Sequence, residues 1–235
     1  MSHETIVESD ETPSSKGVTS ALTKKILLAV ATCHGYRHRA NVQRETWVKD
    51  VGAGADVRFF LGEPHQGSQL EDEIWLGCPD GYADRKEKVI AIIRWAVEGG
   101  YDYLWKLDDD VYLRPERLLT LDAGDYCGAT VGENTAISGA IYGLSLASMK
   151  KLLCANAGEK PDYEDLWVGR RLAEAKVTPT EMGGPDKVNG RFRMTESKRY
   201  RALVPQDPPL PTNDVIASWE HPPERMVEIH QRFHS

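Results

Sequence analysis

The stretch "YLWKLDDDVYL" (residues 103–113) places Asp108, Asp109 and Asp110 directly after a run in which four of five residues are apolar or aromatic. Adjacent carboxylates repel one another unless a cation lies among them. An extended chain alternates its side chains, so Asp108 and Asp110 would point to one side and Asp109 to the other. Carboxylate oxygens suit Mg²⁺ or Mn²⁺, and phosphate oxygens commonly complete the coordination of these ions. The stretch therefore predicts a metal–diphosphate site at the end of a buried strand, with a solvated acidic turn as the alternative.

The residues before this stretch alternate between strand-like and helix-like patterns. Apolar runs and apolar 3.6-residue periods predict, in order, a strand at 26–32, a helix at 39–50, a strand at 56–62, a helix at 84–100 and a strand at 101–107. This alternation indicates an α/β fold with a mostly parallel sheet. Ligands of such sheets bind beyond the carboxyl ends of the strands, which is where the three aspartates lie.

The second half of the chain has a more mixed pattern. It predicts strands at 125–132 and 136–145, and helices at 146–158, 162–176 and near 222–233. Residues 183–213 are rich in Gly, Pro, Arg and Lys, which predicts loops over the site. Residues 1–22 are acidic and rich in Ser and Thr, and they predict a disordered tail ahead of one domain at 23–235.

The composition is that of a soluble globular protein, with 40% hydrophobic residues, 28% charged residues and a net charge of −7. The negative charge argues against a protein that binds duplex nucleic acid. No run approaches the ~18 apolar residues of a membrane span, and no signal peptide is evident, so we expect either a cytoplasmic location or a protein that has lost a membrane anchor. The basic segment 198–204 could contact a membrane peripherally, although a solvated loop is the simpler interpretation.

A second acidic pair, Glu164 and Asp165, opens the predicted helix in "YEDLWVG" (163–169). Acids in a first helical turn complement the helix dipole, which is one explanation of the pair. The functional explanation is that Asp165 points into the cleft and removes a proton from a substrate hydroxyl. A neighbouring glutamate and partial burial would raise the pKa of Asp165 toward working pH, as a general base requires.

Basic residues and one histidine are further candidates. The segment "RHRANVQRETW" (37–47) offers Arg37, Arg39 and Arg44 around a helix start, where guanidinium groups suit phosphate; a solvated basic face is the alternative. His221 precedes a helix that begins with proline, and its imidazole could turn inward as a metal ligand.

Taken in chain order, these segments resemble the β-1,3-galactosyltransferase-like proteins of glycosyltransferase family 31, including Fringe-related and β-1,3-N-acetylglucosaminyltransferase members. The likeness covers about residues 25–233. It rests on six motifs: Arg39-x4-Arg44-x-Thr46-Trp47, "VRFFLG" (57–62), Tyr82-x-Asp84-x3-Lys88, "KLDDDVYL" (106–113), "SGAIYGLS" (138–145) and "EDLWVG" (164–169).

The resemblance implies a single-domain GT-A fold, which is a Rossmann-like nucleotide-sugar-binding fold with a mixed central sheet. It also implies a UDP-sugar donor, Mn²⁺ or Mg²⁺, and inverting transfer of a hexose or N-acetylhexosamine to a glycan or glycolipid hydroxyl, with a β-1,3-type linkage. By position it gives Asp110, Asp108 and His221 as metal ligands and Asp165 as the catalytic base. Donor contacts would come from Asp108 or Asp109, together with the basic residues Arg39, Arg44 and Lys88.

The chain also departs from the family pattern. The usual membrane anchor and stem are absent, although family members are often Golgi-lumenal. Ala136 and Ile137 stand where the family has a cysteine, and Asp84 and Lys86 replace an asparagine and a threonine. Donor identity therefore stays open. Two alternatives also stay open. One is a non-catalytic sugar or nucleotide-sugar binding module of the same fold. The other is a sugar-nucleotidyltransferase, although no Gly-rich loop with a lysine follows the first strand.

Overall fold

A computed structural model describes residues 24–131, 136–155, 163–181, 217–218 and 222–234. Its centre is a seven-stranded sheet in the order β3-β2-β1-β4-β7-β6-β8, and a two-stranded sheet pairs β5 with β9. The strands are β1 (Ile26–Ala31), β2 (Asp56–Glu63), β3 (Glu73–Pro79), β4 (Tyr103–Asp108), β5 (Tyr112–Leu113), β6 (Tyr126–Val131), β7 (Ala136–Ser145), β8 (Thr180–Glu181) and β9 (Ala217–Ser218).

The direction of one strand makes the large sheet mixed. Strands β3, β2, β1 and β4 run parallel to one another, and β8 is parallel to β6. Strand β7 runs antiparallel to both β4 and β6. The predicted mixed α/β architecture is therefore confirmed, and the first residues of β7 lie at the same end of the sheet as the last residues of β4.

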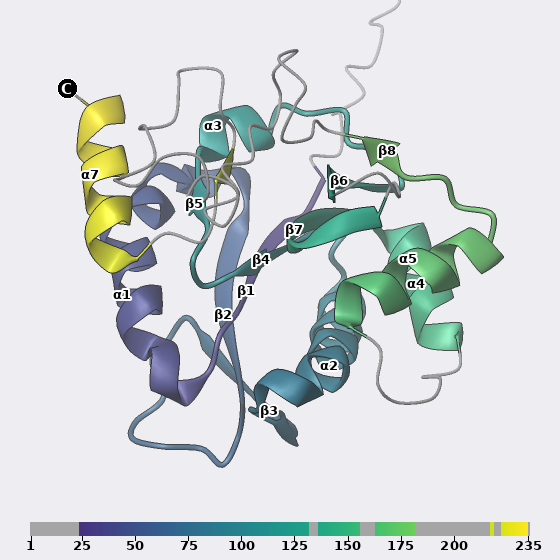
Figure 1. The fold of residues 1–235 in the computed structure, drawn as a ribbon, viewed down its shortest axis with the longest axis horizontal. Helices are drawn as coiled ribbons and strands as arrows, with labels where there is room; N and C mark the ends of the chain where they lie inside the picture. Colours follow the sequence, from purple (N-terminus) through teal and green to yellow (C-terminus); the bar gives the residue numbers. More distant parts are fainter. Residues whose placement is uncertain (1–23, 132–135, 156–162, 182–216, 219–221, 235) are drawn as a thin grey trace, which may run out of the picture.

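Helices cover both faces of this sheet (Figure 1). On one face lie α2 (Arg85–Glu98), α4 (Leu146–Cys154) and α5 (Glu164–Glu174); on the other lie α1 (Arg37–Glu45), α3 (Pro115–Leu118) and α7 (Pro223–Phe233). Strand β1 is buried between the two layers. Its residues Leu27 and Ala29 join the core beneath α2, while Leu28 and Val30 join the core beneath α1. This double burial explains why β1 is a continuous apolar run.

Most predicted elements are present with shifted ends, but β3 and the two-residue strands β5 and β8 were not predicted. Strand β3 contains Gly77 and ends at Pro79, so its sequence lacks a clear strand pattern. The helix predicted at 39–50 is divided, because α1 ends at Glu45 and a 3₁₀ helix, η2 (Trp47–Asp50), follows. The predicted tail at 1–22, the segment 183–213 and His221 lie outside the described residues. Among the described helices, none has the length and apolar character to cross a membrane.

A glycine sets the close approach of β3 to β2. A Cβ atom at Gly62 would lie 2.5 Å from the carbonyl oxygen of Cys78 and 2.8 Å from the carbonyl group of Pro79. The Gly62 amide also donates a hydrogen bond of 2.6 Å to Oδ1 of Asp80, the residue that follows β3. The absence of a side chain at Gly62 therefore brings Asp80 to the carboxyl edge of the sheet.

This packing predicts that Gly62→Ala lowers the free energy of unfolding by about 1–3 kcal/mol, because its methyl group would force β3 away from β2. Gly77→Ala in β3 is the matched control, since the nearest atom to its Cβ would be a Glu63 oxygen at 4.0 Å. Urea unfolding followed by circular dichroism measures both variants. Equal stability of the two variants would contradict the close approach.

Candidate functional site

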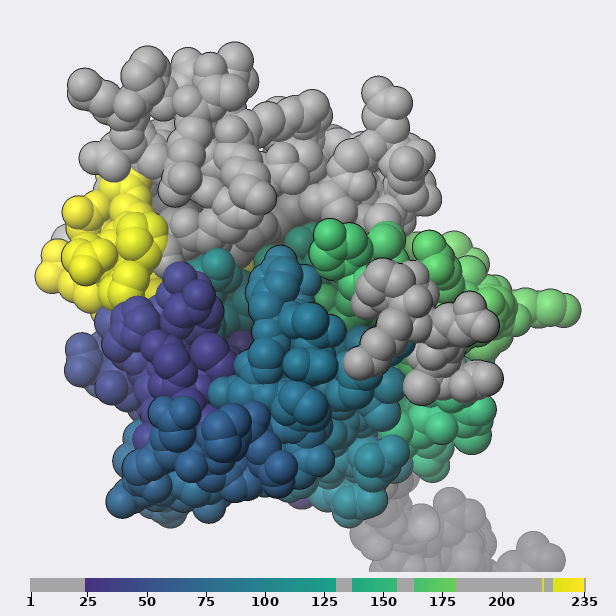
Figure 2. All heavy atoms as spheres, turned by 60° about the horizontal axis from the view of Figure 1, so that its bottom comes forward, coloured from purple at the N-terminus to yellow at the C-terminus, as the bar shows by residue number. Residues whose placement is uncertain are grey.

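A cleft of about 670 Å³ opens at the carboxyl edge of the parallel strands. Its walls come from the ends of β1 and β4, the first residues of β7, the residues between β3 and α2, and the start of α5. Figure 2 looks toward this end of the molecule, where purple, blue and green segments that are far apart in the sequence share one face. The predicted position of the site, beyond the strand ends, is where the cleft lies.

The three aspartates lie in this cleft but have different surroundings. Strand β4 ends at Asp108, so Asp109 and Asp110 belong to a turn and not to an extended strand. Asp109 is buried, and its Oδ2 accepts a hydrogen bond of 2.8 Å from the hydroxyl of Thr32. Its Oδ1 lies 3.2 Å from Nη1 of Arg39. Asp109 therefore joins β4 to β1 and α1, and both of its oxygens are engaged.

Asp108 belongs to a buried ion network on the opposite side, around Lys106. The Lys106 ammonium donates to Oδ1 of Asp108 at 2.5 Å, to the Gly139 carbonyl at 2.5 Å and to Oε1 of Glu164 at 3.1 Å. Burial alone would lower the pKa of Lys106, but the two carboxylates hold that pKa above its ordinary value. Lys106 is only 2% exposed, and its two carboxylate partners favour the charged form, so a buried ammonium joins β4, β7 and α5.

Around Lys106, two described carboxylates share the single ammonium group. Burial raises the pKa of Asp108 to about 6, and the nearby carboxylates of Glu164 and Asp110 add to the rise while Lys106 opposes it. Oδ2 of Asp108 makes no hydrogen bond within the described residues, and Asp110 lines the same cleft. Two hard carboxylate donors that line one cleft fit a divalent cation of the Mg²⁺ or Mn²⁺ type, with phosphate and water as the other ligands.

Asp165 stands at the other wall, at the first turn of α5. Its Oδ2 accepts a hydrogen bond of 3.1 Å from the Gly139 amide, and its Oδ1 accepts one of 2.8 Å from the Leu166 amide. Burial and the adjacent Glu164 carboxylate raise the pKa of Asp165 above its ordinary value. Both acids line the cleft, but Glu164 is buried against Lys106, whereas Asp165 is half-buried.

Gly139 lies between these charges. Its amide donates to Asp165 and its carbonyl accepts from Lys106. A Cβ atom at this position would lie 3.0 Å from Oε1 of Glu164 and 3.2 Å from Oδ2 of Asp165. The glycine therefore permits the start of α5 to approach the first residues of β7.

The predicted arginines have separate positions. Arg39 lines the cleft, where it contacts Asp109 and lies over the ring of Tyr36 at 4.2 Å. Arg44 does not line the cleft; its guanidinium pairs with Asp72 at 2.8 Å and with Glu73 at 3.3 Å. Of these two, only Arg39 is therefore placed to meet a ligand in this cleft.

Lys88 lies in the cleft wall beside Asp80, a residue that sequence reasoning missed. The Lys88 ammonium donates to Oδ1 of Asp80 and to the Thr32 carbonyl, both at 2.6 Å. Burial alone would raise the pKa of Asp80, but hydrogen bonds from Lys88 and from the amides of His34 and Gly62 hold that pKa below its ordinary value. Asp80 follows β3, which the sequence did not predict, so looking for polar residues at the ends of predicted strands could not identify it.

Comparison with solved structures gives the class of fold. LgtC, in a structure of an active-site mutant, aligns with a TM-score of 0.50 and 15% sequence identity over 88% of this chain and 95% of that chain. A glycosyltransferase involved in the glycosylation of the major capsid of PBCV-1 aligns with a TM-score of 0.51 and 15% identity over 88% of this chain and 99% of that chain. The fold is of the GT-A glycosyltransferase type, as predicted.

The sequence matches no protein-family model and no curated protein. The likeness to family 31 therefore rests on the six sequence motifs.

Lys106→Met tests the buried network. The substitution would leave the carboxylates of Asp108 and Glu164 close together without their cation, and breaking a buried ion pair typically costs about 3–5 kcal/mol. We expect urea unfolding to show that the free energy of unfolding falls by this amount. Adding Glu164→Gln should restore part of it, because one of the uncompensated charges is then removed.

Lys151→Met is the matched control, because Lys151 is an exposed lysine on α4. Its stability should stay within about 0.5 kcal/mol of the parent chain. If Lys106→Met unfolded at the same urea concentration as this control, the network would not be a stabilising element.

Proposed function

We propose that the protein is an inverting, metal-dependent glycosyltransferase that moves a hexose or N-acetylhexosamine from a UDP-sugar to a glycan hydroxyl. One observation carries the proposal. A single cleft has acids suited to a metal–diphosphate on one wall, Asp108 and Asp110, and a carboxylate with a raised pKa, Asp165, on another. The GT-A type of fold supports the same reaction class.

The donor side of the cleft would hold the diphosphate through charge. When bound, a divalent cation on Asp108 and Asp110 would stabilise the negative charge that develops on the leaving diphosphate. Arg39 supports this role, because Asp109 and the ring of Tyr36 fix its guanidinium at the cleft wall. His221 was predicted as a further metal ligand and lies outside the described residues, so its role stays a prediction.

The chemical step would use Asp165 as the general base. Its carboxylate takes the proton of the acceptor hydroxyl while that oxygen forms a bond to the anomeric carbon of the sugar. The bond from the anomeric carbon to the diphosphate oxygen breaks at the same time, and UDP leaves with the electron pair. Attack from the opposite face inverts the configuration, so no enzyme nucleophile is required.

The residues at the mouth of the cleft support the proposal that the acceptor is a sugar. Exposed side chains with large apolar surfaces line it: Tyr36, Tyr82, Tyr163 and Leu166. Arg85 lies over the Tyr82 ring at 3.6 Å, which holds that ring in place. Exposed aromatic groups around a polar cleft commonly mark a ligand site, and their faces suit the apolar faces of sugars. The β-1,3-type linkage and the choice of donor rest on the family-31 motifs.

Replacing Asp165 by asparagine tests the base. We expect Asp165→Asn to reduce kcat by ~10²–10⁴-fold, the usual contribution of general base catalysis, with donor affinity unchanged. A coupled assay of UDP release with a panel of UDP-sugars and glycan acceptors measures it. Glu174→Gln, an exposed carboxylate near the other end of α5, is the matched control and should retain parent activity.

The same residue predicts the acidic limb of the pH profile. Asp165 acts only when deprotonated, and its pKa is raised, so kcat should fall as pH drops through a value above the ~3.9 of an ordinary aspartate. Asp165→Asn should lose this limb. Parent-level turnover of Asp165→Asn, or an unchanged acidic limb in its residual activity, would exclude Asp165 as the base.

The metal–diphosphate site has its own test, which needs no acceptor. UDP with Mn²⁺ should raise the melting temperature of the parent chain by mass action, and Asp110→Ala should lose the Mn²⁺-dependent part of that rise. Asp122→Ala, an exposed aspartate that does not line the cleft, is the control and should behave like the parent. An unchanged response of Asp110→Ala would remove Asp110 from the site, and no response in the parent would contradict the proposal.

A further inference from the structure

Three side chains of metal-ligand type meet where the C-terminal helix passes η2. His230 lies in the last turn of α7, His234 is the residue directly after that helix, and Asp50 is the last residue of η2. Nε2 of His234 lies 3.1 Å from Oδ2 of Asp50, and Nδ1 of His230 lies 3.7 Å from the same oxygen. Within the described residues, this is the one group of three His, Cys, Asp or Glu side chains compact enough to hold a metal ion.

We propose that Asp50, His230 and His234 bind a zinc ion that fastens α7 to η2. A tetrahedral zinc ion with bonds of about 2.0–2.1 Å needs ligand atoms about 3.3 Å apart. The two distances to Asp50 lie on either side of that value, and all three ligand atoms lie within 4.8 Å of one another. Two histidines at i and i+4 at the end of one helix, with an acid from another element, can bind zinc, and water would occupy the fourth position.

The surroundings of the two histidines support zinc over a bare hydrogen-bond cluster. The ring centroids of His230 and His234 lie 4.3 Å apart, so both rings already face the same space. The side chains are 21%, 51% and 28% exposed for His230, His234 and Asp50, which leaves an entry path from solvent.

One hydroxyl group competes with zinc for a nitrogen of His230. The hydroxyl of Tyr112 lies 3.2 Å from Nδ1 of His230, and zinc binding at that nitrogen would replace this contact. The Tyr112 ring also stacks on Phe233 at 6.2 Å, so its packing does not depend on the hydroxyl. Tyr112→Phe therefore removes the competitor while keeping the ring.

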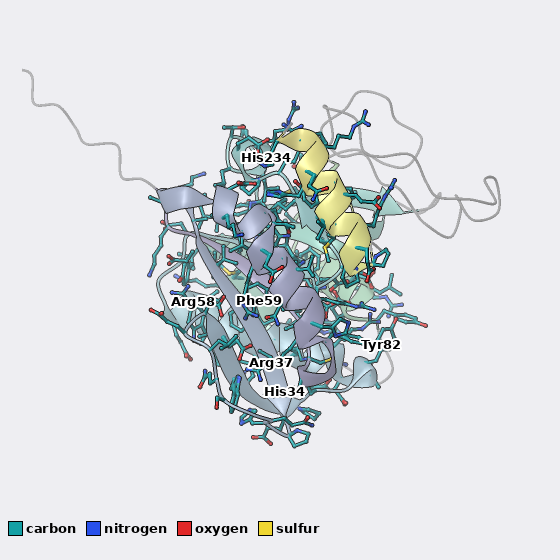
Figure 3. All side chains as sticks on the ribbon, turned by 90° about the vertical axis from the view of Figure 1, so that its left-hand side faces the viewer. His34, Arg37, Arg58, Phe59, Tyr82 and His234 are labelled. Carbon is teal, nitrogen blue, oxygen red and sulfur yellow. The ribbon has the colours of Figure 1, made fainter. Side chains whose placement is uncertain are left out.

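The zinc ion would act on the fold and not on the reaction. Figure 3 shows His234 at the opposite end of the molecule from His34 and Tyr82, and Tyr82 lines the cleft. The buried face of α7, with Met226 and Ile229, belongs to the same core as Ala40 of α1. A zinc ion at the C-terminal end of α7 would thus fix the position of the helix that packs against α1.

The test uses the full chain, freed of metal with a chelator and then titrated with Zn²⁺ alone. Calorimetry should find zinc bound at this site, and a zinc concentration 100-fold above the dissociation constant should raise the melting temperature by about 5–10 °C. The variants His230→Gln and His234→Gln should each lose that rise. His38→Gln, an exposed histidine on α1, is the matched control and should retain it.

Two further variants separate this site from the cleft and from the competing hydroxyl. Asp110→Ala should keep the full zinc response, whatever it does to the response to UDP and Mn²⁺. Tyr112→Phe should bind zinc at least as tightly as the parent. An equal zinc response in the parent and in His234→Gln would overturn the proposal, as would the absence of any response in the parent.

Discussion

The site depends most on the contacts that the buried ammonium group of Lys106 makes. A charged group in the interior is stable only when partners surround it, and here the partners come from three elements: Asp108 of β4, the Gly139 carbonyl of β7 and Glu164 of α5. These elements carry the two walls of the cleft. One internal cation therefore holds together the acids suited to a diphosphate and the helix that presents Asp165.

The reversed direction of β7 makes this arrangement possible. Strands that run parallel to β4 would bring their last residues to the cleft, whereas β7 brings its first residues there, including Gly139. The peptide groups at this position can then donate toward Asp165 and accept from Lys106. Because Gly139 has no side chain, α5 can approach closely enough for both hydrogen bonds to form.

The sequence predicts those parts of the molecule that depend on local pattern. The apolar run of β1, the helical period of α2 and the acids after β4 indicate the sheet, its carboxyl edge and the place of the cleft. The sequence does not reveal the parts that depend on contacts between residues far apart along the chain. Arg44 matches a family motif, yet its charge is taken up by Asp72 and Glu73. Lys106 is one residue in a quoted motif, and only the fold reveals its partners.

Long separations along the chain also set the order in which the site can assemble during synthesis. Asp109 is 77 residues beyond Thr32, so this pair is complete when the ribosome has made the first half of the protein. Glu164 comes 58 residues after Lys106, and the chain must extend past α5 before that ammonium gains its second carboxylate. A nascent chain can therefore form the contact between Asp109 and Thr32 before Glu164 exists, although this earlier contact closes the longer loop and carries the larger closure cost.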